Sequence, residues 1–193
     1  EQQIQQEAEL RLTQNAQPAI GAFSMGLYKT FQQAGFQADF TAGHSFGELT
    51  ALWAAGVVSD DDFRMLARLR GEAMAAPVSG AGENNTEGFD AGKMIAVVGD
   101  PAKVAEDIKG IKDVSIANYN ANNQVVVAGV SAQVNIAFDA LKTKGYKVVN
   151  LPVSAAFHTS LVGHAQKPFA KAIDKAKFTS PTIPVYSNST GKA

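Results

Sequence analysis

The stretch GHSFGELTALWAAG, residues 43–56, places a serine between two glycines where one kind of local structure gives way to another. The residues before it, 36–43, alternate between apolar and polar side chains as a strand does, and those after it suit a helix that ends at Gly56. A G-x-S-x-G pattern between a strand and a helix is typical of a nucleophile elbow, whose tight turn needs small residues at both glycine positions. Gly43 and Gly47 meet this requirement. We therefore predict that Ser45 is a nucleophile.

The elbow also predicts where negative charge can be stabilised. The turn would place the Ser45 hydroxyl at the N-terminus of the next helix, where free N–H groups and the helix dipole favour an anion. We expect the backbone N–H of Phe46 to be one oxyanion donor. The five-residue pattern alone also fits an ordinary turn between glycines, and it is the flanking strand and helix that favour the catalytic interpretation.

A serine hydroxyl needs a base to take its proton, and the chain has three histidines. The His44 side chain would point away from Ser45 in an elbow, so it is expected to be a structural hydrogen-bonding group. His164 lies in a stretch, 161–177, that favours a helix. His158 ends a loop that follows an expected strand, and such a loop can reach an elbow serine. We predict His158 as the general base.

No triad carboxylate is evident in the sequence. Asp174 is the only acidic residue after His158, and it lies well inside the expected helix. Either a backbone carbonyl orients His158, or the orienting group lies outside this chain.

Arg70 lies on the apolar side of the helix that a capping box, Ser59 followed by Asp62, is expected to open. One interpretation is an arginine at the edge of the apolar face that reaches water or pairs with Glu72 or Glu48. The other is a guanidinium that binds a substrate carboxylate through two parallel hydrogen bonds, which would select a dicarboxylic acyl group.

The order of expected elements predicts an α/β fold with two parts. Residues 76–92 are rich in Gly, Asn, Ser and Pro and are expected to form a loop. The patterns that follow read strand, helix, strand, strand, helix, strand, which is the ferredoxin-like order. We predict a larger α/β core over residues 1–91 and 152–193, with a small ferredoxin-like subdomain over 92–151 inserted into it.

Composition narrows the classes of function. Seventeen basic and eighteen acidic residues give a net charge of −1, which does not favour a nucleic acid or an anionic membrane as partner. No cysteine is present, so there is no disulfide and no thiolate nucleophile or ligand, and no metal site is expected. No apolar run reaches the roughly 18 to 20 residues of a membrane helix. We expect a cytoplasmic protein, and a piece of a longer one because it opens on Glu1.

Four motifs in order, GHSFGE, RLRGEAM, NYNANNQVVVAG and LPVSAAFH, resemble the malonyl-CoA:acyl carrier protein transacylase family and the acyltransferase domains of polyketide and fatty acid synthases. The stretch TQNAQPAIGAF and the elbow are most similar to acyltransferase domains of bacterial polyunsaturated fatty acid synthases. The resemblance implies an α/β-hydrolase-like large subdomain with a ferredoxin-like insert.

The resemblance also implies roles for individual residues. Ser45 would carry the acyl ester, His158 would act as base and then as acid, and Arg70 would hold the malonyl carboxylate. Asn120 matches an asparagine of the cleft wall, and His44 belongs to the same substrate-binding set. Phe157 resembles the HAFH form that accompanies malonyl selection, although Ala155 stands where that form has its first histidine.

Two segments of the family have no match in this chain: the N-terminal GQGSQ loop that completes the oxyanion hole, and the later segment whose backbone carbonyl orients the histidine. The expected substrates are malonyl-CoA and the phosphopantetheine thiol of an acyl carrier protein, with no bound cofactor, and the expected neighbours are other domains of a synthase. A serine thioesterase or other hydrolase, with water as acceptor, and an inactive docking module are the alternatives.

Overall fold

The computed structural model describes residues 2–75 and 90–193 and divides the chain into two compact units. The first unit is Glu1–Met74 with Ala165–Ala193, and the second is Ala75–His164. Most of the loop expected over 76–92 lies outside the described residues. The predicted domain boundaries next to residues 92 and 151 stay a prediction.

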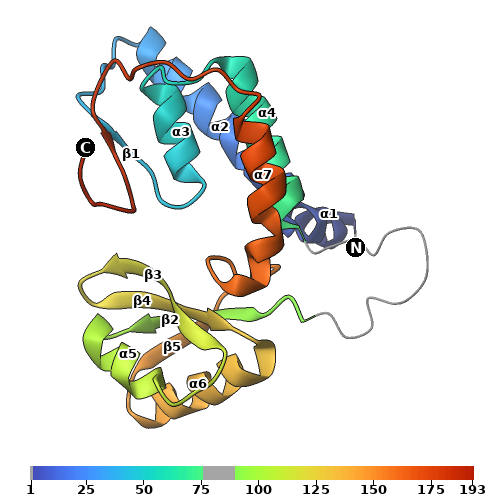
Figure 1. Cartoon of the computed structure of the whole chain (residues 1–193), viewed down its shortest axis with the longest axis vertical. Coiled ribbons are helices and arrows are strands. Elements are labelled where there is room, and N and C mark those ends of the chain that lie inside the picture. Colours follow the sequence, from blue (N-terminus) through green and yellow to red (C-terminus); the bar gives the residue numbers. More distant parts are fainter. Residues whose placement is uncertain (1, 76–89) are drawn as a thin grey trace. The chain divides into compact units, whose positions relative to one another are not determined.

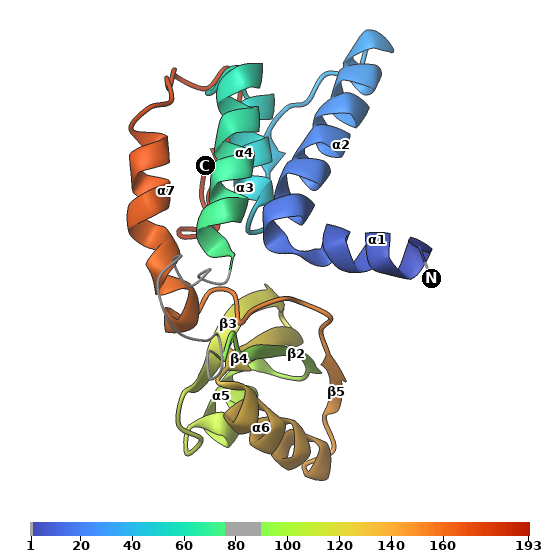
Figure 2. The ribbon, with the colours of Figure 1, turned by 90° about the vertical axis from the view of Figure 1, so that its right-hand side faces the viewer.

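Helices make up most of the first unit (Figure 1): α1 (Gln2–Arg11), α2 (Thr13–Gln33), α3 (Gly47–Ala54), α4 (Asp60–Met74) and α7 (Gln166–Ile173). The expected capping box opens α4, because the Asp62 N–H donates to the Ser59 Oγ at 3.1 Å. Helix α4 lies against α2, α3 and α7 (Figure 2). Its Phe63 and Leu66 are fully buried in the core of this unit. The apolar face of α4 is therefore the centre of this unit's core.

The first unit also contains a short parallel sheet of β1 (Thr41–Ala42) and β6 (Val185–Tyr186). A strand was expected over 36–43, but only Thr41–Ala42 forms a ladder. The two aromatic residues of the alternating pattern pack on other rings instead: Phe36 lies 6.5 Å from Tyr28 of α2, and Phe40 lies 5.5 Å from Tyr186, both between ring centroids. Ring packing thus accounts for the apolar alternation ahead of the short strand.

The second unit is an antiparallel sheet with its two α-helices on one face. Its elements are β2 (Lys93–Val98), α5 (Pro101–Ile108), β3 (Val114–Ala121), β4 (Gln124–Gly129), α6 (Ser131–Thr143), β5 (Lys147–Asn150) and the 3-10 helix η1 (Ser160–Ala165), whose last residue belongs to the first unit. The strand order is β3-β4-β2-β5 with every pair antiparallel. The strand and helix order predicted for residues 92–151 is therefore confirmed.

Alternation along β4 separates the two faces of this sheet. Val125 and Val127 are fully buried in the core that α5 and α6 cover. Val126 and Ala128 face the other side, where Ala156 packs on them. The loop that carries Ala156 and the neighbouring His158 is thus held on the sheet face opposite the helices.

Residues 161–177 were expected to form one helix, and the structure divides the segment. Helix η1 has 3-10 geometry over Ser160–Ala165, and the α-helix α7 covers only Gln166–Ile173. Pro168 lies in the first turn of α7, where a missing backbone N–H costs no helical hydrogen bond.

Candidate active site

Ser45 lies on a strained turn between β1 and α3. Its φ is 54°, in the left-handed region that is rare for residues other than glycine. The Gly47 N–H donates to the His44 carbonyl at 2.9 Å, and the Glu48 N–H donates to the Ser45 carbonyl at 3.1 Å, so the helix begins immediately after the serine. The Ser45 side chain is half-buried rather than sealed in the core. Local geometry is therefore that of the predicted elbow.

The two glycines of the motif differ in what they allow. A Cβ on Gly43 would lie 2.5 Å from the Glu48 nitrogen and closer still to the Gly47 carbonyl, because the start of α3 crosses directly over Gly43. A Cβ on Gly47 would meet nothing within 4 Å outside its own helix. Gly43 therefore has to be a residue without a side chain, as expected. The space around Gly47 would admit a side chain.

Phe46 anchors the turn through its side chain. The ring is buried in the core, 6.4 Å from the Phe63 ring between centroids, and its tip lies 3.2 Å from the position a Cβ on Gly21 of α2 would take. Its backbone N–H lies between that of Ser45, which donates to the Asn188 Oδ1, and that of Gly47, which donates to the His44 carbonyl. A buried ring therefore fixes the backbone segment predicted to supply the oxyanion donor.

Arg70 lies half-buried on α4, beside the elbow. Its Nη1 donates to the Gln17 Oε1 at 2.6 Å, and the Gln17 Nε2 donates to the Thr13 Oγ1 at 2.7 Å, which fixes the orientation of the amide. The guanidinium carbon lies 6.0 Å from the centroid of the Phe46 ring. Burial lowers the pKa of Arg70, and the nearby Glu48 carboxylate opposes that shift.

The two carboxylates that the sequence suggested as partners for Arg70 accept hydrogen bonds from other groups, although Glu48 lies close enough to act on the pKa of Arg70. The Glu72 carboxylate accepts from Arg68 at 2.7 Å on the outer side of α4. The Glu48 Oε1 accepts the backbone N–H of Asn188 at 2.7 Å. Gln17 was missed by the sequence analysis because it is 53 positions from Arg70 in the chain and reaches it only through the packing of α2 on α4.

Asn188 is a second residue that the sequence analysis missed. It follows β6, and its side chain contacts the elbow on both sides of His44, at Gly43 and at Ser45. The available signal was the polar run SNST, residues 187–190, at the end of the strand-like stretch TIPVYSN, since side chains at the carboxyl ends of parallel strands meet at one edge.

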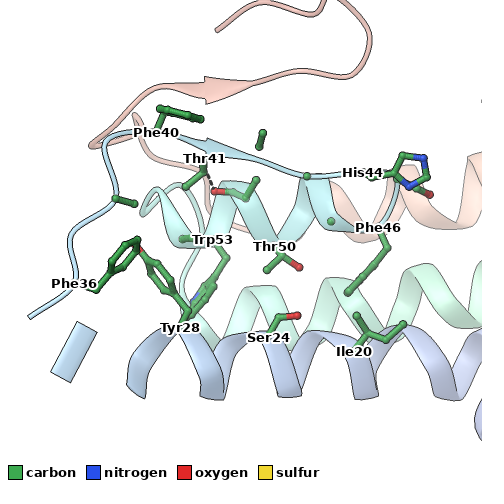
Figure 3. A pocket seen from close by; sticks show the side chains of 17 residues that line it. Ile20, Ser24, Tyr28, Phe36, Phe40, Thr41, His44, Phe46, Thr50 and Trp53 are labelled. Carbon is green, nitrogen blue, oxygen red and sulfur yellow. Dashed lines mark hydrogen bonds between the residues drawn. The ribbon is translucent and has the colours of Figure 1, made fainter. Parts of the chain in front are cut away.

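A cavity of about 570 Å³ opens next to the elbow in the first unit (Figure 3). It is bounded by residues of β1 and the elbow on one side and by α2 and α3 on the other, with the aromatic rings of Tyr28, Phe36, Phe40 and Trp53 at one end. Phe46 points from the elbow toward Ile20 of α2, and His44 lies at the end of the cavity away from Tyr28 (Figure 3). The wall of this cavity is mainly apolar.

His158 lies in the second unit, on a loop that backbone contacts hold in place. The Ala156 N–H donates to the Ala91 carbonyl at 2.8 Å, and the Thr159 Oγ1 donates to the Ala156 carbonyl at 2.6 Å. Gly92, with a φ of 80°, passes so close that a Cβ there would lie 2.5 Å from the Ala156 Cβ. His158 itself is exposed and has a φ of 60°. Such strain in a pinned loop is common where function fixes a side chain.

Phe157 and Asn120 belong to the same unit. Phe157 is half-buried and packs on the cluster formed by Met94, Val126, Ala128 and Ala156. Asn120 is exposed on β3, between two residues where the register with β4 shifts. Such a bulge turns a side chain away from the regular ladder.

The predicted site residues thus fall into two groups. His44, Ser45, Phe46 and Arg70 are brought together in the first unit, whereas Asn120, Phe157 and His158 lie in the second. The pairing of Ser45 with His158 joins one unit to the other and stays a prediction.

Over the described ranges 2–75 and 90–193, no cluster of His, Asp or Glu has the arrangement needed to hold a metal ion. None of the helices described there is long and apolar enough to cross a membrane.

Known proteins share both the sequence and the fold of this chain. A family model described as "Acyl transferase domain" matches residues 2–193. The chain is 36% identical over 189 residues to the malonyl CoA-acyl carrier protein transacylase of Bacillus subtilis, covering 93% of this chain and 56% of that protein. It is 31% identical over 193 residues to a polyunsaturated fatty acid synthase polypeptide of Thraustochytrium sp., covering 99% of this chain and 6% of that protein.

A solved structure shares the fold. It is a complex of a type II polyketide synthase acyl-carrier protein with its malonyl-transacylase, and the match has a TM-score of 0.83 and 33% identity, covering 96% of this chain and 59% of the solved chain. The chain spans little more than half the length of the Bacillus transacylase.

Proposed function

Because this chain belongs to the acyl transferase domain family, we propose that it moves a malonyl group from coenzyme A, through an ester on Ser45, to the phosphopantetheine thiol of an acyl carrier protein. The observation that carries this proposal is the strained serine at the start of α3, on a turn where the space at Gly43 admits no side chain. A turn of this kind is how a nucleophilic serine is presented in acyl transfer.

In the first half-reaction the Ser45 Oγ attacks the carbonyl carbon of the malonyl thioester while His158 takes the hydroxyl proton. The Phe46 N–H donates to the oxygen that becomes negative. The carbon–sulfur bond then breaks, and coenzyme A leaves as a thiol with the proton from His158. The product is a malonyl ester on Ser45.

In the second half-reaction the carrier's thiol gives its proton to His158 and attacks the ester carbonyl. The carbon–oxygen bond breaks, and the Ser45 oxygen recovers the proton. Atoms balance with a malonyl thioester and a thiol on each side, so no cofactor is consumed.

Arg70 supports a carboxylate-bearing acyl group as substrate. A half-buried guanidinium beside the elbow is a costly group to desolvate, and an anion in the site offsets that cost. With Nη1 held by Gln17, the planar group has a fixed orientation toward its ligand. His44, Phe157 and Asn120 are proposed to line the rest of the acyl and pantetheine path.

The proposal for the carrier protein as partner is supported by the solved complex in which a similar malonyl-transacylase holds its acyl-carrier protein. The match to the polyunsaturated fatty acid synthase polypeptide supports neighbouring synthase domains as further partners. The same likenesses support an α/β-hydrolase-like body for the first unit and a ferredoxin-like subdomain for the second.

Intact mass spectrometry after mixing the full-length protein with malonyl-CoA tests this function. We expect an added malonyl mass that maps to Ser45 and disappears in Ser45→Ala. Ser59→Ala is the matched control, because that serine caps α4 away from the elbow and should leave the adduct unchanged. Absence of an adduct on Ser45 refutes the proposal, and release of free malonate in place of transfer to the carrier thiol would identify a hydrolase.

A further inference from the structure

Asn188 lies at the sheet edge where the elbow is built. Strands β1 and β6 run parallel, with Thr41 opposite Val185 and Ala42 opposite Tyr186. The residues that follow parallel strands emerge at the same edge, so Asn188, two positions after β6, lies beside the turn that follows β1. This placement joins parts of the chain 143 positions apart.

Three hydrogen bonds connect Asn188 to the elbow. Its Oδ1 accepts the backbone N–H of Ser45 at 3.2 Å, and its Nδ2 donates to the Gly43 carbonyl at 2.6 Å. Its own backbone N–H donates to the Glu48 Oε1 at 2.7 Å. The Asn188 side chain thus connects Gly43 to Ser45. Glu48, in the first turn of α3, binds the Asn188 backbone and helps to keep that side chain in place.

The orientation of the Asn188 amide is determined by these partners. One partner is a donor, the Ser45 N–H, and the other is an acceptor, the Gly43 carbonyl. Reversing the amide would put donor against donor and acceptor against acceptor. Among side chains of this size, an amide supplies both an acceptor and a donor without a charge, whereas a carboxylate supplies only acceptors.

We propose that Asn188 is a positioning residue, which keeps the strained backbone at Ser45 in the conformation that presents its hydroxyl. A residue at a φ of 54° stays there only when surrounding contacts over-determine it, and Asn188 supplies contacts on both sides. Its bond to the Ser45 N–H also occupies that donor. The Phe46 N–H is thereby left as the elbow donor for an oxyanion.

This inference rests on the proposed function, since a serine that is not a nucleophile needs no positioning. Its test therefore uses a fluorophosphonate probe, which labels an activated serine whatever the natural acyl group is. The labelling rate at Ser45 is followed by intact mass in the full-length protein and in Asn188→Leu, Asn188→Asp and Thr190→Val. Thr190→Val is the control, because the Thr190 hydroxyl bonds within the same C-terminal loop, to Lys192, rather than to the elbow.

We expect Asn188→Leu to slow labelling by about 10- to 100-fold, the effect of a displacement of about 1 Å at a reacting group. In malonyl transfer it should lower kcat by a similar factor and leave KM within about twofold, because the lost interaction shapes the nucleophile rather than the substrate site. Asn188→Asp keeps an acceptor for the Ser45 N–H and should recover part of the rate. Thr190→Val should match the unmodified protein.

The possible results separate the two proposals. If Ser45 in the unmodified protein is not labelled, the proposed function fails. If it is labelled, and Asn188→Leu reacts at the unmodified rate, the positioning role is refuted. The role is also refuted if Asn188→Leu and Asn188→Asp lose rate equally and both melt at a lower temperature in proportion, because that pattern describes a purely structural residue.

Discussion

Replacing Gly43 with alanine should break the elbow, whereas the same change four positions later at Gly47 should be tolerated. A Cβ at Gly43 would lie 2.5 Å from the Glu48 nitrogen and closer still to the Gly47 carbonyl, and real Cβ atoms essentially never approach other atoms within 3.0 Å. The atoms it meets are backbone, so no side chain can turn aside. The start of α3 would have to move by about 1 Å, which is enough to misplace a nucleophile.

The size of the effect follows from this overlap. Overpacking in a region that cannot relax costs about 3 kcal/mol, which for a chain of this length lowers the melting temperature by about 6 to 12 °C. A displacement of about 1 Å should also slow acylation of Ser45 by about 100-fold. A Cβ added at Gly47 would have no neighbour within 4 Å outside its own helix, and Gly47 has no positive φ. Gly47→Ala should therefore change the free energy of unfolding by less than about 1 kcal/mol.

Both variants are compared with the unmodified full-length protein by thermal melting and by the rate of fluorophosphonate labelling at Ser45. The reasoning is refuted if Gly43→Ala melts and reacts as the unmodified protein does. It is equally refuted if Gly47→Ala lowers the melting temperature and the labelling rate as much as Gly43→Ala does, since the space around the two glycines would then not decide the outcome.

Gln17→Leu should lower the preference for malonyl over acetyl thioesters by about tenfold, because Arg70 loses its hydrogen bond to the Gln17 amide and can turn. The ratio of the kcat/KM values for the two thioesters checks this. Gln32→Leu, at an exposed position on the same helix, is the control. Asp90→Ala should lower the melting temperature of the second unit, since Asp90 accepts the Ser131 N–H at 2.7 Å at the start of α6 and such caps contribute about 1 kcal/mol. Bonds from Ser131 hold the pKa of Asp90 below its usual value, so this stabilisation is complete above about pH 4 and is lost as pH falls through the lower folded pKa. Melting curves at neutral pH and near pH 3 should show the gap between Asp90→Ala and the unmodified protein narrowing at the lower pH, and a constant gap would contradict the assignment.

Much of the candidate site follows from local sequence. The elbow needs only a glycine that tolerates a crossing backbone, a serine in a turn and a helix that starts at once, and these are properties of neighbouring residues in GHSFGE. The capping box before α4 and the short apolar runs of β2 and β4 are equally local, which is why the sequence predicted α4 and the order of elements in the second unit. The length of β1 was overestimated, because aromatic packing produces the same alternation as a strand ladder.

The sequence by itself determined which residue is the nucleophile candidate, where α4 begins and the order of helices and strands in the second unit, because hydrophobic period and turn chemistry act between residues close in the chain. Only the tertiary structure decided that Gln17 holds Arg70 and that Asn188 bridges the elbow. Each of those pairings depends on a side chain meeting a distant segment through the packing of α2 on α4 or of β1 beside β6. Polar residues such as these carry no periodic signal, so their partners become known only when the folded chain brings them into reach.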